Sequence, residues 1–158
     1  MQQRDDTTFL NEYGRFNFRV GAVIIDNGRI LMVRNKKNSE YYSVGGRCKI
    51  NETTAAAAER ECLEETGIRF RADRLGFIHE NFFTSVNERF HEISFYYYMI
   101  PLESIDGIGK DKLDLTEDEE LEWIPIDKAK DIPNFYPDFF KTALVDSSFD
   151  IKHFITKD

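Results

Sequence analysis

The sequence is short of several residue types, and each shortage excludes a class of protein. Its 158 residues include only two cysteines, Cys48 and Cys62, and no CxxC pattern. Neither a disulfide framework nor a zinc site is therefore expected. No apolar run approaches the roughly 20 residues of a membrane span, and the start, MQQRDDTTFL, has neither the basic nor the apolar region of a signal peptide. We expect a cytoplasmic protein without a membrane partner.

Positive charge is also scarce. The chain has 21 Lys and Arg residues against 29 Asp and Glu residues, which gives a net charge of −8. Binding to a nucleic-acid duplex requires a basic face for the phosphates, so we do not expect it. A small anionic substrate stays compatible with this charge, because a bound divalent cation and a few local basic residues set the field in a site.

The residues that are abundant indicate a globular domain. Hydrophobic residues make up 41% of the chain and aromatic residues 14%, which suggests a core rich in sheet. A chain of this length buries roughly 70% of its unfolded surface, and no linker or repeat interrupts it. We expect one domain over residues 1–158. The aromatic hairpin of residues 77–84 and 90–100 would suit a homodimer interface, although the sequence leaves the oligomeric state open.

One helix is strongly predicted, over residues 53–66. A run of four alanines near its start has high helix propensity. Asn51 or Thr53 can cap its N-terminus, and Gly67 suits the left-handed position that follows a helix.

Three carboxylates share one face of this helix. A helix advances about 100° per residue, so Glu64 and Glu65 fall at about −60° and about +40° from Glu61. Like charges at these spacings cost roughly 0.2–0.5 kcal/mol per pair, and a divalent cation would remove that cost. The plainer interpretation is a solvated acidic face, and spacing alone does not separate the two.

The segment from Gly46 to Ile68 resembles the Nudix box. That pattern is G-x(5)-E-x(7)-R-E-U-x-E-E-x-G-U, in which U is aliphatic. Cys62 is a small apolar residue where the pattern has an aliphatic one. The matching residues are Gly46, Glu52, Arg60, Glu61, Glu64, Glu65, Gly67 and Ile68.

The resemblance implies a fold and an activity. The fold is α/β, a Nudix-type α/β/α sandwich with a mixed β-sheet. The implied activity is Mg²⁺-dependent hydrolysis, with Mn²⁺ as the other cation to consider. The substrate is a nucleoside diphosphate linked to a group X, which yields a nucleoside monophosphate and phospho-X. Both a nucleoside diphosphate-sugar such as ADP-ribose and a nucleoside triphosphate fit this description.

The resemblance also implies the metal ligands. These are the side chains of Glu61 and Glu65, often with Glu64, and the backbone carbonyl of Gly45 or Gly46. Mg²⁺ takes hard oxygen ligands in octahedral geometry, which this set offers.

Other box residues carry further roles in this interpretation. Glu64 is also the candidate base for the attacking water, so the catalytic set is Glu64, Glu61 and Arg60. Arg60 and Glu52 look like a structural pair that holds the loop against the helix. Gly67 supports the box by ending the helix.

Many Nudix enzymes use one more carboxylate from outside the box. Here Glu119 and Glu120, at the end of the long connection 101–120, are the first candidates, and Glu92 is the second. Long connections inside a compact domain are often functional.

Three basic residues are candidates for substrate binding. Arg34 begins a basic turn, and Arg47 and Lys49 follow the glycines. They could meet an outer phosphate or a base of the substrate, although most basic turns are only solvated.

The pairs His79-Glu80 and His91-Glu92 lie on the two arms of an expected hairpin. A His-Glu pair could act as a general base with its orienting group. We expect these arms to contact substrate rather than to transfer protons.

Outside the helix, apolar and turn residues predict a series of strands. Asp26-Asn27-Gly28 is a strong hairpin signal. Gly45-Gly46 is expected to be a loop, and strand 121–126 to be central. Residues 136–145 are predicted as a second helix with Pro137 in its first turn. The predicted strands are 16–25, 28–34, 41–44, 69–75, 77–84, 90–100 and 121–126, with 149–155 as an edge strand.

Three other functions remain to be compared with hydrolysis. A Nudix-fold sensor that binds a nucleotide without cleaving it would usually lose a box carboxylate, and all three are present. Isopentenyl diphosphate isomerase needs a catalytic cysteine and glutamate outside the box, and neither Cys48 nor Cys62 has that setting. A purely structural domain has no reason to keep the acidic face.

Overall fold

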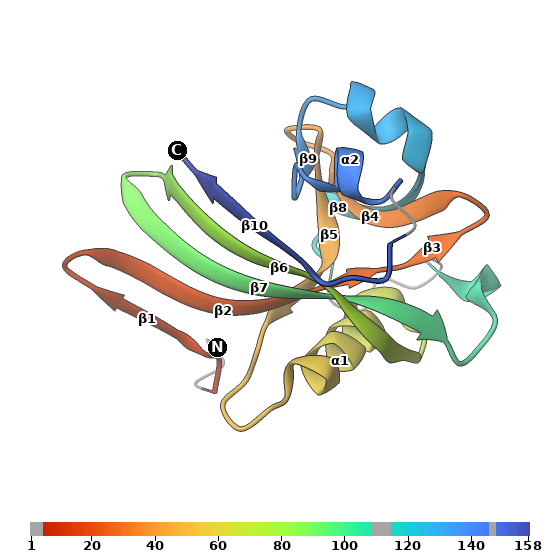
Figure 1. Cartoon of the computed structure of the whole chain (residues 1–158), viewed down its shortest axis with the longest axis horizontal. Coiled ribbons are helices and arrows are strands. Elements are labelled where there is room, and N and C mark those ends of the chain that lie inside the picture. Colours follow the sequence, from red (N-terminus) through yellow and green to blue (C-terminus); the bar gives the residue numbers. More distant parts are fainter. Residues whose placement is uncertain (1–4, 109–114, 146–147) are drawn as a thin grey trace.

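The computed structural model describes residues 5–108, 115–145 and 148–158. Figure 1 shows a twisted sheet with one long helix against one face and a smaller helical segment against the other. Two 3₁₀ turns span Ile105–Gly107 and Ile126–Asp131. The strands and helices are β1 (Thr8–Asn11), β2 (Gly14–Val23), β3 (Ile25–Asp26), β4 (Arg29–Asn35), β5 (Glu40–Arg47), α1 (Thr54–Thr66), β6 (Phe70–Ser85), β7 (Glu88–Pro101), β8 (Glu119–Pro125), β9 (Phe135–Tyr136), α2 (Phe140–Ala143) and β10 (Lys152–Lys157).

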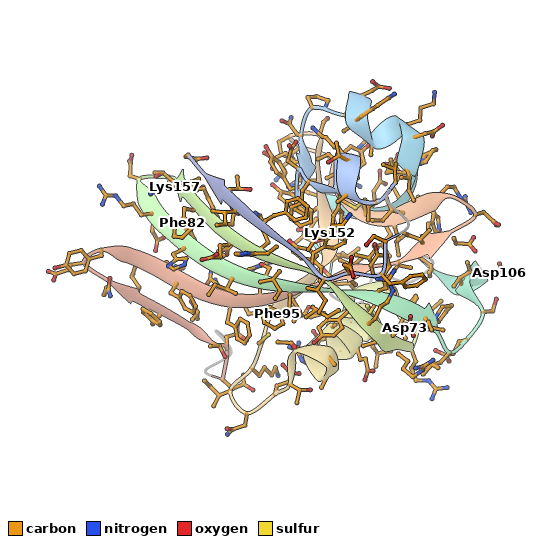
Figure 2. The ribbon with its side chains drawn as sticks, viewed as in Figure 1. Asp73, Phe82, Phe95, Asp106, Lys152 and Lys157 are labelled. Atoms are coloured by element: carbon orange, nitrogen blue, oxygen red, sulfur yellow. The ribbon has the colours of Figure 1, made fainter. Side chains whose placement is uncertain are left out.

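The sheet is mixed. Its strand order is β10-β6-β7-β2-β5-β4-β3, with β1 beside β2, β8 beside β4 and β9 beside β5. β2 pairs in parallel with β7, and β10 with β6, whereas β6 and β7 form a long antiparallel hairpin. The expected α/β fold with a mixed sheet is confirmed. Part of the sheet extends beyond both helices, and Figure 2 places Phe82 and Lys157 on this extension and Asp73 near the other end of β6.

Two apolar cores lie on the two faces of the sheet. Ala57, Ala58 and Cys62 of α1 pack against Val20, Val44 and other buried residues of the first core. The second core contains Phe77, Tyr96, Phe135 and Phe140. Among the described residues, none of the helices is both long and apolar enough to cross a bilayer.

Helix α1 has the predicted ends. Thr53 is the N-cap, and its Oγ1 accepts a hydrogen bond from the Ala56 N–H at 3.2 Å. Gly67 has φ 75° and donates its N–H to the Leu63 carbonyl at 2.9 Å. Asn51, the other predicted cap, adopts a left-handed conformation with φ 64° before the helix.

The predicted first hairpin is right at its turn and wrong in its extent. Asn27 and Gly28 have φ 49° and 72°, and Asp26 pairs with Arg29. Only the two residues of β3 pair with β4, whereas β2 pairs with β1, β5 and β7. The chain leaves one set of strands and joins another near Ile24, and local turn chemistry carries no information about that change.

The predicted glycine loop is wrong, because Gly45 and Gly46 lie inside β5. They pair with Gly21 and Val20 of β2. A Cβ on Gly45 would overlap the Val20 carbonyl oxygen. The glycines therefore serve the close approach of two strands rather than a turn.

The second helix is much shorter than predicted. Tyr136 pairs with Tyr42 as a strand, and the Pro137 carbonyl accepts a hydrogen bond from the Phe140 N–H at 3.1 Å in a tight turn. Only Phe140–Ala143 is α-helical. The helical spacing of Phe139, Phe140 and Leu144 does put all three in the second core, so a single turn satisfies the pattern.

Two further strand predictions change, and a third is confirmed. Strand β8 is not central, since in the described part of the chain it pairs only with β4, and it begins at Glu119. Residues 70–85 form one strand with irregular register near Ala72 and Leu75. The C-terminal strand is confirmed as an edge strand, paired with β6. The predicted connection 101–120 falls partly outside the described residues.

Candidate functional site

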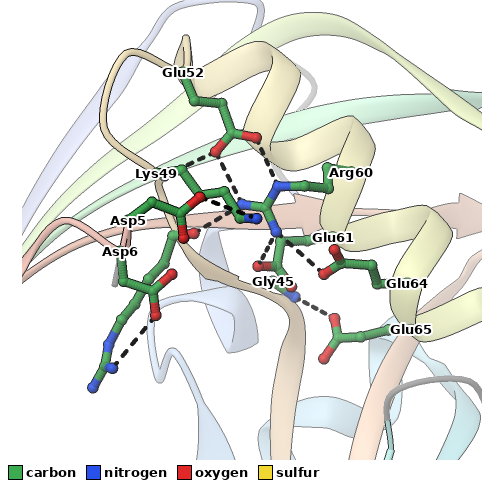
Figure 3. A network of polar contacts seen from close by, with 10 residues as sticks. Asp5, Asp6, Gly45, Lys49, Glu52, Arg60, Glu61, Glu64 and Glu65 are labelled. Atoms are coloured by element: carbon green, nitrogen blue, oxygen red, sulfur yellow. Dashed lines mark hydrogen bonds and ion pairs between the residues drawn. The ribbon is translucent and has the colours of Figure 1, made fainter. Parts of the chain in front are cut away.

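Arg60 is the centre of the box network shown in Figure 3. Its Nε and Nη2 donate to the two carboxylate oxygens of Glu52 at 2.7 and 2.9 Å. Nη2 also donates to the Arg47 carbonyl at 3.0 Å, so the helix is tied to the end of β5. Bidentate arginine–carboxylate pairs combine strength with a fixed geometry.

The same guanidinium reaches two of the box carboxylates. Arg60 Nη1 donates to Glu61 Oε1 at 2.9 Å and to Glu64 Oε2 at 3.2 Å. The side chain of Glu61 is buried, whereas that of Glu64 is one-third exposed. Burial raises the pKa of Glu61, and the charge and hydrogen bond of Arg60 oppose that rise.

Glu65 is held by a different partner. The Gly45 N–H donates to Glu65 Oε2 at 2.7 Å. Burial raises the pKa of Glu65 to about 8, the nearby charges of Glu61 and Glu119 add to the rise, and the Gly45 hydrogen bond and Arg19 oppose it. Among the described residues, Glu65 has no ion-pair partner within 4.0 Å.

The residues present fit a divalent cation. Among Glu61, Glu64 and Glu65, Arg60 contacts only the first two, so one arginine accompanies three carboxylates and a cation would offset the remaining negative charge. A Cβ on Gly46 would overlap the Glu61 carboxylate, so the glycine leaves the space that this group occupies. Arg60 holds Glu61 and Glu64, whereas the Gly45 N–H holds Glu65. Accordingly, no group of three His, Cys, Asp or Glu side chains is already clustered as metal ligands in residues 5–108, 115–145 and 148–158.

The three candidates for the extra carboxylate have different surroundings. Glu119 is close enough to Glu65 for its charge to raise the pKa of that group. Glu120 instead pairs with Arg34 at 3.4 Å. Glu92 accepts a hydrogen bond from Asn17 at 2.7 Å and lies on the other face of the sheet. Glu119 is therefore the candidate whose charge acts on a box carboxylate.

The predicted basic residues are already engaged by acidic ones. Arg47 lies 3.7 Å from Asp6, and Lys49 lies 3.4 Å from Asp5. Arg34 is on β4, where it pairs with Glu120 away from Arg60 and its partners. Arg47 and Lys49 lie next to the box network, whereas Arg34 does not.

Neither His-Glu pair forms a contact between its own members, because consecutive residues of a strand point to opposite faces. His79 Nε2 is hydrogen bonded to Thr156 Oγ1 at 2.9 Å, whereas Glu80 bonds His153 at 2.7 Å. The His91 ring stacks on Phe82 at 4.3 Å. Burial, aided by His153, lowers the pKa of His79 to about 4, so this ring is neutral near pH 7.

A cavity of about 600 Å³ lies on the sheet face opposite α1. Its walls come from β2, β5, β6, β7, β9 and β10 and from the loop after β9. Arg19 of β2 lines it, and the charge of Arg19 also lowers the pKa of Glu61 and Glu65. The charge of Arg19 therefore acts on the box as well as on the cavity.

Sequence reasoning missed both Arg19 and the cavity. Arg19 is the one charged residue in the run FNFRVGAVII, and a charge inside an apolar strand is a signal that could have been used. The cavity had no comparable signal, because its walls come from segments far apart in the chain.

The comparison with known protein families decides the identity. The sequence profile of the NUDIX domain matches residues 15–143. The chain belongs to the Nudix family. The membership and the fold that the box predicted are thus confirmed.

A relative matches part of the chain in sequence. A MutT-like protein from Streptomyces ambofaciens is 36% identical over 61 residues, which cover 39% of this chain and 40% of that protein. The match therefore spans about two fifths of the relative's length.

Solved structures share the fold at low identity. A mutator MutT protein from Bacillus halodurans has a TM-score of 0.62 and 17% identity, with 89% of this chain and 90% of that chain covered. An ADP-ribose pyrophosphatase from Streptococcus suis has a TM-score of 0.56 and 14% identity, with 87% and 98% covered.

Proposed function

We propose that the chain is a Nudix pyrophosphohydrolase that cleaves a nucleoside diphosphate linked to X into a nucleoside monophosphate and phospho-X. The observation that carries this proposal is the complete box, in which Arg60 holds Glu61 and Glu64 and the Gly45 N–H holds Glu65. The cavity that Arg19 lines would hold the rest of the substrate.

Mg²⁺, or Mn²⁺, is the proposed cofactor. Glu61, Glu65 and Glu64 would hold it together with the carbonyl of Gly45 or Gly46. When bound, a divalent cation neutralises phosphate charge and lowers the pKa of the attacking water.

Each of the other side chains has its own proposed role. Arg60 keeps the carboxylates of Glu61 and Glu64 aimed at the same region and ties α1 to β5. Glu64 is the proposed base, because its carboxylate is partly exposed and can accept a proton from a water. Arg19 would hold a phosphate at the mouth of the cavity, and Glu119 is the proposed extra carboxylate.

The proposed reaction is compatible with several substrates. One structural relative is named a mutator MutT protein and another an ADP-ribose pyrophosphatase. We favour a nucleoside diphosphate-sugar, with ADP-ribose first, over a nucleoside triphosphate.

A hydrolysis screen tests the proposal. The purified chain is incubated with Mg²⁺ or Mn²⁺ and with ADP-ribose, dinucleoside polyphosphates, NADH or nucleoside triphosphates, and the products are identified by mass. We expect metal-stimulated release of a nucleoside monophosphate from at least one of them. No turnover on any substrate, with tight nucleotide binding in calorimetry, would favour a sensor instead.

A further inference from the structure

The cavity opposite α1 has an unusual balance of charge. Arg19 is the only cation among its lining residues, and His79 is neutral near pH 7. Four carboxylates line the same space, namely Glu40, Glu92, Asp138 and Asp158. Glu92 lies 4.0 Å from Arg19, and Asp138 pairs with Lys141 at 2.9 Å. Among the described residues, Glu40 and Asp158 have no ion pair.

Four aromatic rings share the rest of the wall with small polar side chains. Tyr42, Phe83, Tyr96 and Tyr136 all line the cavity. Tyr42 and Tyr136 are stacked with centroids 5.8 Å apart and planes 26° apart, and they are 40% and 43% exposed. The Tyr42 hydroxyl donates a hydrogen bond to Glu40, so a carboxylate is fixed at the edge of this ring pair.

The two ends of β5 have different charged neighbours. At one end Gly45 donates to Glu65, and Arg19 lies close enough to act on the same carboxylate. Glu40 begins the strand, and at about 3.3 Å per residue it lies roughly 16 Å from Gly45. The end of the cavity with Arg19, its only lining cation, therefore suits a phosphate, and the end with Glu40 and the tyrosines does not.

We propose that this cavity takes the ring end of the substrate and prefers a ring that carries a positive charge. The inference rests on the proposed function, because it places the phosphates at the box, and it changes the order of substrates given there, because both rings of ADP-ribose are neutral. Aromatic faces are negative and attract cations, and the carboxylates beside them add to that attraction. A neutral ring receives only the stacking, and an anionic head group is repelled.

Nicotinamide mononucleotide provides a matched pair of probes. Its oxidised form has a cationic ring and its reduced form a neutral ring of nearly the same size, while the ribose and phosphate are unchanged. We would measure the Kd of both forms for the full chain by calorimetry in the presence of Mg²⁺. The oxidised form is expected to bind about fivefold more tightly.

A variant and a control locate the effect. Glu40→Gln keeps an acceptor for Tyr42 but removes the charge, and we expect it to reduce the ratio to about twofold or less. Glu12→Gln makes the same change at an exposed residue between β1 and β2 and should leave the ratio unchanged.

Three results would overturn the inference: equal or tighter binding of the reduced form, a ratio that Glu40→Gln leaves intact, or no binding of either form at millimolar concentration. The readout is binding and requires no turnover. A chain that shows the preference but hydrolyses nothing would support the inference and contradict the proposed activity. A chain that hydrolyses a diphosphate without the preference would do the reverse.

Discussion

The two faces of the sheet hold their polar groups in different ways. On the α1 face, a single guanidinium makes short contacts to Glu52, Glu61 and Glu64. On the opposite face, aromatic rings wall the cavity and its charged groups are spread along several strands. The first arrangement comes from one contiguous segment and the second from strands far apart in the chain. In the proposed function, the reaction chemistry is therefore encoded locally, whereas the choice of substrate depends on the whole fold.

Removing one charge from the box should have the largest effect. Glu61→Gln or Glu65→Gln keeps the size of the side chain and removes a hard anionic ligand, so we expect turnover to fall by about two to three orders of magnitude. Circular dichroism and the melting temperature should show that the fold survives. The measurement is kcat at saturating Mg²⁺.

Glu59→Gln is the matched control on the same helix. Glu59 Oε1 accepts a hydrogen bond from the Ala72 N–H at 3.0 Å, and a glutamine oxygen can do the same. This variant should keep its activity. Unchanged turnover in Glu61→Gln or Glu65→Gln would remove the assignment of these residues as metal ligands.

The second prediction concerns the arginine at the centre of the network. Arg60→Lys keeps the charge but loses the planar fork that serves Glu52 and the Arg47 carbonyl together. We expect a loss of about 2–3 kcal/mol in the free energy of unfolding, because partly buried charge-assisted hydrogen bonds are broken. Urea denaturation measures it.

Arg29→Lys offers the comparison for a surface pair. Arg29 lies 3.3 Å from Asp26, and both side chains are more than 30% exposed. The free energy of unfolding should change by less than about 0.5 kcal/mol in this variant. Equal losses in the two variants would mean that the Arg60 network is no more than a surface pair.

The box could be predicted because its rules are local. The N-cap at Thr53, the left-handed Gly67 and the placing of Glu61, Glu64 and Glu65 follow from positions within one helix. The Asn27-Gly28 turn followed from turn chemistry in the same way.

The rest depended on long-range pairing. Gly45 and Gly46 have the composition of a loop, yet their role is set by strand β2, more than 20 residues earlier in the chain. Residues 136–145 have helical spacing, yet the pairing of Tyr136 with Tyr42 leaves one helical turn. A local pattern does not record which distant strand is adjacent, so the cavity could not be inferred from it.

A third prediction makes the same substitution on both faces. On the cavity face, a Cβ at Gly21 would overlap the Tyr96 ring, which packs edge-on against Phe139 and Phe140. Such a ring has little room to move, so Gly21→Ala should cost about 2 kcal/mol of stability.

On the box face, the Cβ of Gly46→Ala would overlap the end of the flexible Glu61 side chain. The carboxylate can shift only by giving up its hydrogen bond to Arg60, so stability should fall by about 1 kcal/mol, while kcat should fall by about tenfold or more. Urea denaturation and kinetics on both variants check the pair. A large stability loss in Gly46→Ala, or a small one in Gly21→Ala, would contradict this contrast between the faces.

The last prediction is a pH dependence on the cavity face. His79 is buried, and its pKa in the folded protein is about 4, below the ordinary value of about 6.5 that applies when the chain is unfolded. The unfolded chain therefore takes up a proton first as the pH falls. The contribution of His79 to stability is complete above about pH 6.5 and is lost progressively toward pH 4. Between pH 7 and pH 5 the loss should be about 2 kcal/mol.

The variant His79→Gln isolates this contribution. Glutamine does not titrate and can still hydrogen bond Thr156. Urea denaturation at pH 7 and pH 5 gives the loss in free energy of unfolding for the wild type and for the variant. The loss should be about 2 kcal/mol larger in the wild type. Equal losses would mean that the acid sensitivity arises elsewhere, because His79 is then no harder to protonate in the folded chain than in the unfolded one.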